Sequence, residues 1–249
     1  MNIIKKFLFI IVLFSGAHLC QTQVPVEITN DVPSIQTPPN ILNRDLLRVG
    51  IYGGYSRMTG ATPTSMGPIY ADHVNRLKNG YHIGADFDVF VSRIVALGVK
   101  YSLFRTKDEI NNLIFEVDGD MIPGKLSQNM FVHYIAPNII LKAGRSAGKV
   151  FFIFDGSMGC LIYKNNATMI QTDFVMRGVT FGVSVAPGIE FKVTPSFAIS
   201  FNLGLTVGTV NTIKATGGIT ETLTNAGENI SRLDVSIGLR WYQLKQKKM

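Results

Sequence analysis

The residue types that could do chemistry are few in this chain and widely spaced. The pair His82 and Asp86 is four residues apart. On a β-strand such residues share a face but lie about 13 Å apart, which is too far for direct general acid–base contact. We therefore interpret His82 as a histidine satisfied inside the fold. His73, beside Asp72 in a predicted loop, is expected to be exposed to solvent.

The other candidate residues are no closer to a catalytic or metal pattern. His133 and Cys160 fall on apolar strand faces, which indicates an interfacial histidine and a small apolar side chain. The chain has no His-x₃-His or Cys-x₂-Cys spacing, and Gly144–Gly148 does not precede a helix. Asp118-Gly119-Asp120 supplies too few ligands for a calcium loop. We predict no catalytic residue, no metal site and no cofactor.

Composition excludes several classes of protein. The 249 residues are 46% hydrophobic and only 16% charged, and they contain two cysteines. Low charge with ample apolar content excludes a disordered chain, and so few cysteines exclude a disulfide scaffold. The net charge of +7 comes from scattered residues, so we predict no nucleic-acid partner.

The N-terminal segment has the layout of a secretory signal peptide. Lys5 and Lys6 precede the apolar run Phe7–Phe14, and small or neutral residues follow as far as Cys20. We expect residues 1–20 to be removed. Lipidation of Cys20 is a second reading, disfavoured because Leu19 is not a small residue. Residues 21–45 carry four prolines and predict an extended polar leader. No later segment has 18 consecutive apolar residues, which excludes a helical membrane protein.

The dominant pattern is strict alternation. Between Phe197 and Gly208 every odd position is large and apolar, and every even position is small or polar. Such a period of two predicts a β-strand with one apolar face. Eight segments show it: 46–58, 80–91, 95–105, 129–142, 150–163, 177–193, 197–209 and 231–243.

The connections between these segments alternate between short and long. Three are short, namely Ser92–Ile94, Ala143–Lys149 and Thr194–Ser196. The other four, 59–79, 106–128, 164–176 and 210–230, are long, which is the layout of a transmembrane barrel. The polar strand face is mostly Gly, Ala, Ser and Thr, whereas a water-exposed face should carry more charge. A secreted sandwich or lipocalin-type barrel is the alternative.

Aromatic residues near strand ends favour a membrane girdle: Tyr52, Tyr55, Tyr81, Tyr101, Tyr134, Tyr163, Trp241 and Tyr242. With the closing run Arg232–Tyr242, the region 46–243 resembles the outer-membrane β-barrel family of Gram-negative bacteria, akin to the OmpA transmembrane domain and OmpX. The resemblance implies an all-β, eight-stranded, antiparallel up-and-down barrel with both termini in the periplasm. Its partners would be membrane lipids and the outer-membrane insertion machinery. Residues 244–249 continue past the expected terminal aromatic as a basic tail.

The polar strand face would line the lumen and carries nearly balanced charge. The acids are Asp86, Asp88, Asp155, Glu190 and Asp234, and the bases are Arg48, Lys100, Lys142, Lys192, Arg232 and Arg240. Buried charges are costly unless paired, so these should form ion pairs. The short connection Ser92–Ile94 sets Asp86 opposite Lys100, which predicts an ion pair between them, and His82 opposite Phe104. A register shift of two residues would pair Asp88 with Lys100 instead. Eight strands leave room for little but side chains, so we expect a plugged lumen.

The function predicted from the sequence is a non-enzymatic envelope protein. Its frame would be structural, and its long loops could bind an extracellular ligand. A narrow solute or ion channel is the alternative, and a lipid-modifying enzyme with a site at the outer rim is the third possibility.

Overall fold

The computed structural model describes residues 45–61, 68–117, 120–144, 148–217, 222–224 and 227–244, all within the compact unit Leu42–Met249. The predicted signal peptide, nearly all of the predicted leader, and the tail after Leu244 lie outside the described residues. Asp118 and Gly119 of the predicted turn also lie outside them.

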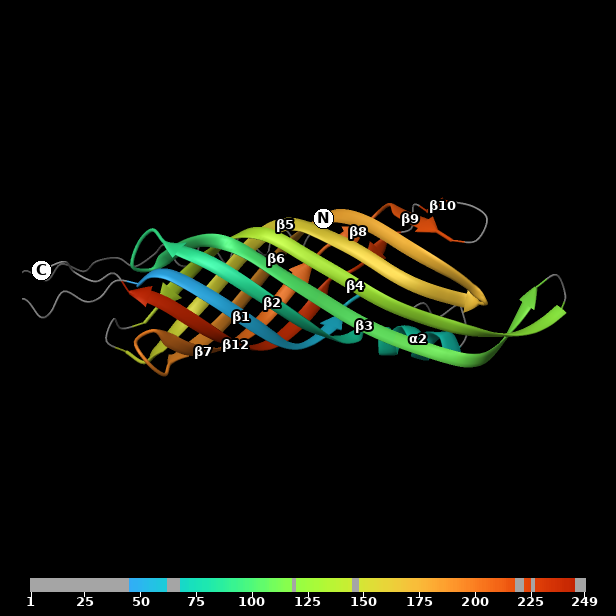
Figure 1. The fold of residues 1–249 in the computed structure, drawn as a ribbon, viewed down its shortest axis with the longest axis horizontal. Helices are drawn as coiled ribbons and strands as arrows, with labels where there is room; N and C mark the ends of the chain where they lie inside the picture. The colour runs from blue at the N-terminus through green and yellow to red at the C-terminus, as the bar shows by residue number, and fades with distance from the viewer. Residues whose placement is uncertain are drawn as a thin grey trace, which may run out of the picture. The chain divides into compact units, whose positions relative to one another are not determined.

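Eight long antiparallel strands close into a ring. They are β1 (Asp45–Met58), β2 (Asn79–Phe90), β3 (Val95–Val117), β4 (Asp120–Ala143), β5 (Val150–Ile170), β6 (Thr172–Lys192), β7 (Phe197–Val207) and β12 (Arg232–Leu244). Each pairs with the next along the chain, and β12 pairs with both β7 and β1. The tight connections β2–β3 and β6–β7 lie at one end of the barrel, together with the start of β1 and the end of β12 (Figure 1). The predicted up-and-down barrel is confirmed.

The apolar strand faces point outward. Phe201, Leu203 and Ile237 are 51%, 62% and 54% exposed, while Ser200, which precedes Phe201 and points to the opposite face, is fully buried. The same alternation runs through β2, β5 and β6. A barrel dissolved in water would bury these apolar side chains, so the exposed apolar belt suits hydrocarbon. The predicted orientation of the two faces is therefore confirmed.

The aromatic residues divide between the two faces. Tyr55, Tyr81, Tyr101 and Trp241 are exposed on the outside. Tyr134, Tyr163 and Tyr242 are almost fully buried, and the ring of Tyr52 lies beneath Lys100 and Arg240 in the lumen. The prediction of an eight-membered girdle is therefore wrong for these four tyrosines. Nearness to a strand end does not fix the face of a residue; its odd or even position along the strand does.

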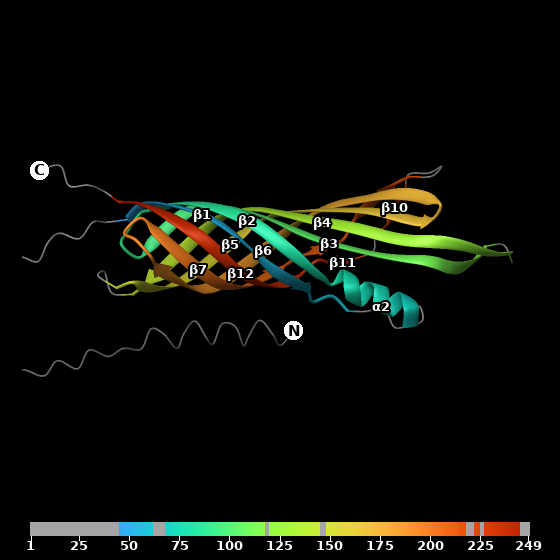
Figure 2. The same cartoon turned by 60° about the horizontal axis from the view of Figure 1, so that its bottom comes forward.

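Two of the predicted long loops are strand extensions. β3 and β4 stay paired from Val95–Leu141 to Val117–Asp120, and β5 and β6 stay paired to Met169–Thr172. Both hairpins continue past the body of the barrel on the side away from the tight connections (Figure 2). The predicted loops 106–128 and 164–176 are wrong. The sequence of these extensions lacks the alternation of large apolar with small or polar residues, but backbone pairing does not need an apolar face and persists.

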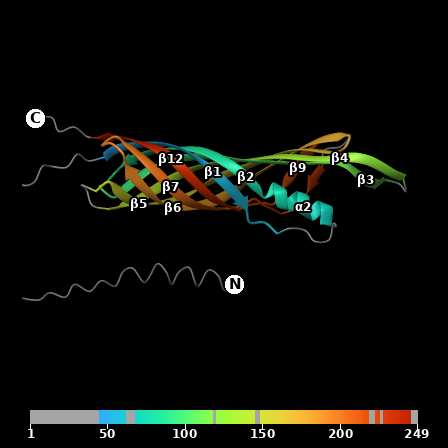
Figure 3. The same cartoon turned by 90° about the horizontal axis from the view of Figure 1, so that it is seen from below.

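The other two long connections contain short elements. α2 (Pro68–Leu77) buries His73 and Leu77 against the barrel and lies beside β3 at the loop end (Figure 3). The segment between β7 and β12 holds β8 (Thr209–Val210), β9 (Ile213–Thr216), β10 (Thr222–Thr224) and β11 (Glu228–Asn229). Among the described residues, no helix has the length and apolar character needed to cross a membrane.

The interior has three layers. At the loop end, Val210, Ile213 and Ile230 from the β7–β12 connection pack against inward side chains that include Phe104 and Leu161. At the other end a second apolar cluster is formed by Phe90, Ala96, Ile140, Ile153, Ala198 and Tyr242. Most of the charged residues lie between these two clusters, and Asp45, Lys142 and Lys192 lie at the end of the lumen opposite the loops.

Candidate functional site

Arg48 is the centre of the charged layer. Its Nη1 lies 2.7 Å from Asp86 Oδ1 and 2.5 Å from Asp88 Oδ2, both on the neighbouring strand β2. Its Nη2 lies 2.6 Å from Glu190 Oε1 on β6, which is not adjacent to β1, so this contact crosses the lumen. The hydroxyl of Tyr242 donates to the other oxygen of Glu190. One guanidinium therefore serves three buried carboxylates and ties separate walls of the barrel together.

Arg240 supplies the second positive charge of this layer. Its Nη1 donates to Asp86 Oδ2, and its Nε lies 3.7 Å from Glu190 Oε1. Arg240 and Asp86 both lie opposite Gly50, on the two strands that flank β1. A Cβ at Gly50 would lie 1.8 Å from Arg240 Nη1 and 2.6 Å from Asp86 Oδ1. Glycine is needed there because the ion pair passes directly over its Cα.

The predicted register of β2 and β3 is confirmed, but the predicted ion pair is wrong. Asp86 lies opposite Lys100, and His82 lies opposite Phe104. Lys100 Nζ nevertheless binds Asp155 Oδ2 on β5 at 2.7 Å, while Asp86 is held by the two arginines. A lysine side chain is long enough to reach past β4, the one strand between β3 and β5, so backbone register does not determine its partner.

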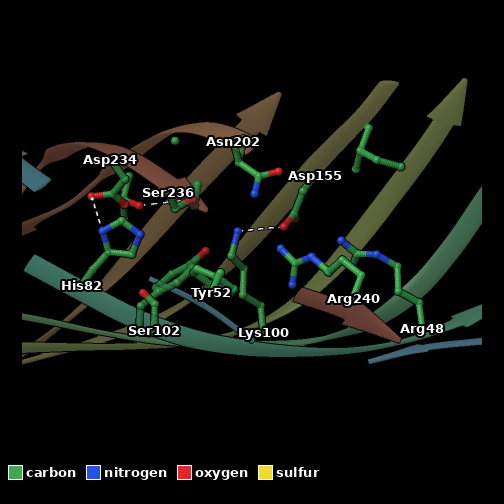
Figure 4. A pocket seen from close by; sticks show the side chains of 16 residues that line it. Arg48, Tyr52, His82, Lys100, Ser102, Asp155, Asn202, Asp234, Ser236 and Arg240 are labelled. Carbon is green, nitrogen blue, oxygen red and sulfur yellow. Dashed lines mark hydrogen bonds and ion pairs between the residues drawn. The ribbon is translucent and has the colours of Figure 1, made fainter. Parts of the chain in front are cut away.

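A small polar cavity lies beside this pair (Figure 4). Its volume is about 30 Å³, and its lining includes Tyr52, Lys100, Asp155, Asn202 and Arg240. Among the described residues, Asp155 Oδ1 and Arg240 Nε are buried without a hydrogen-bond partner. The space can hold a few water molecules, and it is far too small for a solute pathway.

Ser56, His82 and Asp234 bring a hydroxyl, an imidazole and a carboxylate together nearer the loop end of the lumen. Ser56 Oγ donates to Asp234 Oδ1 at 2.5 Å and lies 2.7 Å from His82 Nδ1. Asp234 Oδ1 is 3.9 Å from the same nitrogen, as the dashed line in Figure 4 shows. A nucleophilic relay places the hydroxyl and the carboxylate at opposite ring nitrogens. Here both lie at one nitrogen, and the serine proton points to the carboxylate.

Arg232 completes this group. Its Nε lies 3.2 Å from Asp234 Oδ2, and its Nη2 donates to Ser102 Oγ at 2.7 Å. The guanidinium carbon lies 5.5 Å from the centre of the Phe104 ring, where the apolar loop-end cluster begins. The contact of His82 with Ser56 could have been found from the register, because His82 faces Gly54 on β1 and Ser56 lies two residues farther along β1 on the same face.

Lys142, Lys192 and Asp45 close the opposite end of the lumen. Asp45 accepts from Lys142 at 2.5 Å and from Lys192 at 3.1 Å. The two ammonium groups also lie 4.1 and 5.2 Å from the ring centre of Phe151. Asp45, predicted to be the last residue of the leader, is thus the first residue of β1 and part of the barrel.

His73 is buried, so its predicted exposure is wrong. It lies on α2, and its Nδ1 is 2.5 Å from Asp108 Oδ2 on the extended part of β3. Arg76 Nε donates to Asp108 Oδ1 at 2.8 Å. Burial opposes ionisation of Asp108, but the hydrogen bonds from Arg76 and His73 hold its pKa below the ordinary value. This contact fastens the helix to the hairpin, and it joins residues 35 apart in sequence.

The remaining candidates stay outside any reactive cluster. His133 lies on the outer face, with its Nδ1 2.9 Å from the Tyr101 hydroxyl. Cys160 is a half-buried free thiol opposite Ile135. Within the described residues, no group of three or more His, Cys, Asp or Glu side chains is arranged to hold a metal ion.

Solved structures match this fold. Neisserial surface protein A matches with a TM-score of 0.50 and 10% identity over 79% of this chain and 97% of that chain. The Escherichia coli outer membrane protease OmpT gives a TM-score of 0.49 with 9% identity, over 81% and 98% of the two chains. OprG of Pseudomonas aeruginosa gives 0.44 with 10% identity, over 81% and 99%. No model of a known protein family matches the chain, and neither does any curated protein sequence. The fold is that of the small outer-membrane β-barrels.

Proposed function

We propose that the protein is a non-enzymatic outer-membrane barrel with a closed lumen, and that its loop end carries a surface-binding role. The observation that carries this proposal is the filling of the interior. Two apolar clusters flank an ion-paired layer whose cavity measures only about 30 Å³. A solute would have to displace packed aromatic side chains and break several buried ion pairs to pass.

The geometry at His82 supports a structural role over an enzymatic one. Ser56 and His82 are almost fully buried, and Phe104, the residue opposite His82, belongs to the loop-end apolar cluster. The Ser56 hydroxyl donates its hydrogen bond to Asp234, so it is not oriented for activation by the imidazole. These contacts suit a hydrogen-bonded wall of the barrel.

The loop end has the features of a binding platform. The β3–β4 and β5–β6 hairpins continue past the body of the barrel, and α2 is fastened to the first of them by Asp108. Both hairpins are extensions of rigid membrane strands, so a surface displayed on them would be held in a fixed position.

Conductance measurements test the closed lumen. The full mature chain, reconstituted in planar bilayers, should give no steady channels under conditions in which a general porin conducts. Steady unitary currents would contradict the proposal and favour the narrow channel. Heat-modifiable migration on a gel, measured on the same preparation, establishes that the barrel is folded.

Orientation is tested by labelling single cysteines in intact cells. In a Cys160→Ala background, Lys125→Cys on the β4 extension should react with a membrane-impermeant maleimide. Ser196→Cys in the β6–β7 turn should react only after the outer membrane is permeabilised. The opposite result would place the tight turns outside and would contradict the proposed surface role of the hairpins.

A further inference from the structure

A line of basic residues crosses the outer face of the barrel at the edge of the apolar belt. Across the pairing register, adjacent positions on β3, β4, β5, β6 and β9 are Arg105, Phe131, Lys164, Arg177 and Lys214. All five positions are on the outward face, because the neighbouring odd positions of β3 and even positions of β5 point into the apolar belt. We call the three cations Arg105, Lys164 and Arg177 the basic row.

Like charges face each other within the basic row. Lys164 lies directly opposite Arg177, and Arg177 lies directly opposite Lys214. Directly opposed residues have Cβ atoms about 5 Å apart, and like charges at that spacing repel. Among the described residues, no aspartate or glutamate forms an ion pair with Lys164 or Arg177. The acid on this face of β6, Asp173, is four residues from Arg177, about 13 Å along the strand, and accepts a hydrogen bond from Thr168.

Two cations on the neighbouring β3–β4 hairpin, farther from the belt, do have an acidic partner. Lys107 and Lys125 lie 3.8 and 2.9 Å from Glu109. The β3–β4 hairpin thus provides an acid for these lysines, whereas no described acid forms an ion pair with Lys164 and Arg177 on the β5–β6 hairpin. No described acid therefore balances the charge of Lys164 and Arg177, which makes these two cations suitable partners for an external anion.

Arg105 is held in place by neutral groups. Its Nε donates to Asn129 and its Nη1 to the Tyr81 hydroxyl, each at 3.3 Å, and its guanidinium carbon lies 5.1 Å from the Phe131 ring centre. These contacts orient the guanidinium without cancelling its charge. An oriented guanidinium is well suited to an oxyanion with two accessible oxygens, such as phosphate.

Apolar surface begins directly next to the row. Two residues from Lys164 and Arg177 towards the belt, on the same face, are the exposed Ile162 and Val179, and Phe181 follows Val179. A ligand that satisfies both surfaces needs an anionic head and an apolar tail joined within a few ångströms. This requirement favours a lipid over a soluble anion.

We propose that the basic row binds the headgroup phosphates of a lipid with several phosphate groups, in the leaflet at the loop end, with its acyl chains on Ile162, Val179 and Phe181. This inference rests on the proposed membrane insertion of the barrel. Two opposed cations and a third oriented one can contact more than one phosphate, so a headgroup with clustered phosphates should bind better than one with a single phosphate.

Lipid binding to the purified full chain in neutral detergent micelles tests the proposal by native mass spectrometry. The probes are a bisphosphorylated lipid A, the same lipid with both phosphates removed, inorganic phosphate, and dextran sulfate. We expect selective binding of the bisphosphorylated lipid, weakened by added salt. The double variant Lys164→Gln, Arg177→Gln should lose at least about tenfold in affinity, equal to about 1.4 kcal/mol.

The matched control is the double variant Lys107→Gln, Lys125→Gln, which removes the same charge from the same end of the barrel. Its affinity should stay within about twofold of wild type, well under 1.4 kcal/mol. Equal loss in both double variants, equal binding of the dephosphorylated lipid, or binding of dextran sulfate or inorganic phosphate in place of the lipid would each overturn the inference. Each variant is first shown to be heat-modifiable, so a failed barrel is distinguished from a failed lipid site.

Discussion

Arg240 and Asp86 belong to strands that do not pair with each other, yet their side chains form a buried ion pair over Gly50. The glycine is the only residue between them in the register, and it is small enough for the guanidinium to pass. Asp86 in turn shares Arg48 with Asp88 and Glu190. The glycine at position 50 therefore determines which ion pairs can form in the charged layer.

Gly50→Ala should disrupt that layer. The new methyl group would lie 1.8 Å from Arg240 Nη1 and 2.8 Å from its Cδ, so the arginine must leave Asp86 or the strands must separate. We expect a loss of about 1–3 kcal/mol in the free energy of unfolding, as for other overpacked interiors. Denaturant titration of the barrel in lipid, followed by heat-modifiable migration, measures it.

Gly156→Ala is the control for this substitution. A Cβ there would meet Ile139 Cγ2 at 3.6 Å and Phe154 Cε1 at 3.9 Å, which are ordinary contacts. Its stability should be close to wild type. Equal stability of the two alanine variants would mean that Arg240 has another place to go.

Arg48→Met should be among the most destabilising single changes. It leaves Asp86, Asp88 and Glu190 buried with Arg240 as their remaining close arginine. Removing one partner of a buried ion pair costs about 3–5 kcal/mol. Lys107→Met, which breaks an exposed pair with Glu109, should leave the free energy of unfolding nearly unchanged. Adding Glu190→Gln to Arg48→Met should restore part of the loss, and a double-mutant cycle without coupling would contradict the network.

Arginine substitutions on the outer face report the lipid environment. Leu203 lies in the middle of the outward row of β7, and Val179 lies at the loop end of the belt on β6. In a bilayer, Leu203→Arg should cost about 2–4 kcal/mol and Val179→Arg about 0–1 kcal/mol. Refolding titrations into vesicles measure both. Two small and equal effects would indicate that this face meets water.

Acidification should release α2 from the β3 extension. The pKa of Asp108 is lowered in the folded protein, so the contact contributes its full stabilisation above the ordinary aspartate pKa of about 3.9 and loses it as the pH falls through the lower folded value. A spin label at Asn75→Cys, in a Cys160→Ala background, should become more mobile over that range. Asp108→Asn should be mobile already at neutral pH and show a much smaller change. A label that stays immobile throughout would show that Asp108 does not hold the helix.

The barrel could be predicted from sequence because a single property, the alternation of apolar with small or polar residues, specifies it. Positions such as Phe201 and Leu203 alternate with small or polar residues in every membrane strand, so the strands, their number and the outward apolar face all follow from a period of two. The same reasoning set Asp86 opposite Lys100 through a short turn. Local spacing is sufficient for these features.

Features that depend on side chains reaching through space could not be predicted in the same way. Lys100 reaches past β4 to Asp155, and Arg48 reaches across the lumen to Glu190, so both contacts depend on the curvature of the closed sheet. The burial of His73 depends on Asp108 from another segment. The extended hairpins were missed because backbone pairing does not require an apolar face once the strands leave the belt.

The β3–β4 hairpin also sets a length scale. From Arg105 to Val117 the strand continues for twelve residues, all within β3, and at about 3.3 Å per residue it can extend roughly 40 Å. If the loop end faces the medium, a partner recognised near the tip would be met well clear of the bilayer. Deleting paired residues from β3 and β4 would then bring the site of partner binding closer to the bilayer in steps, without changing the wall of the barrel.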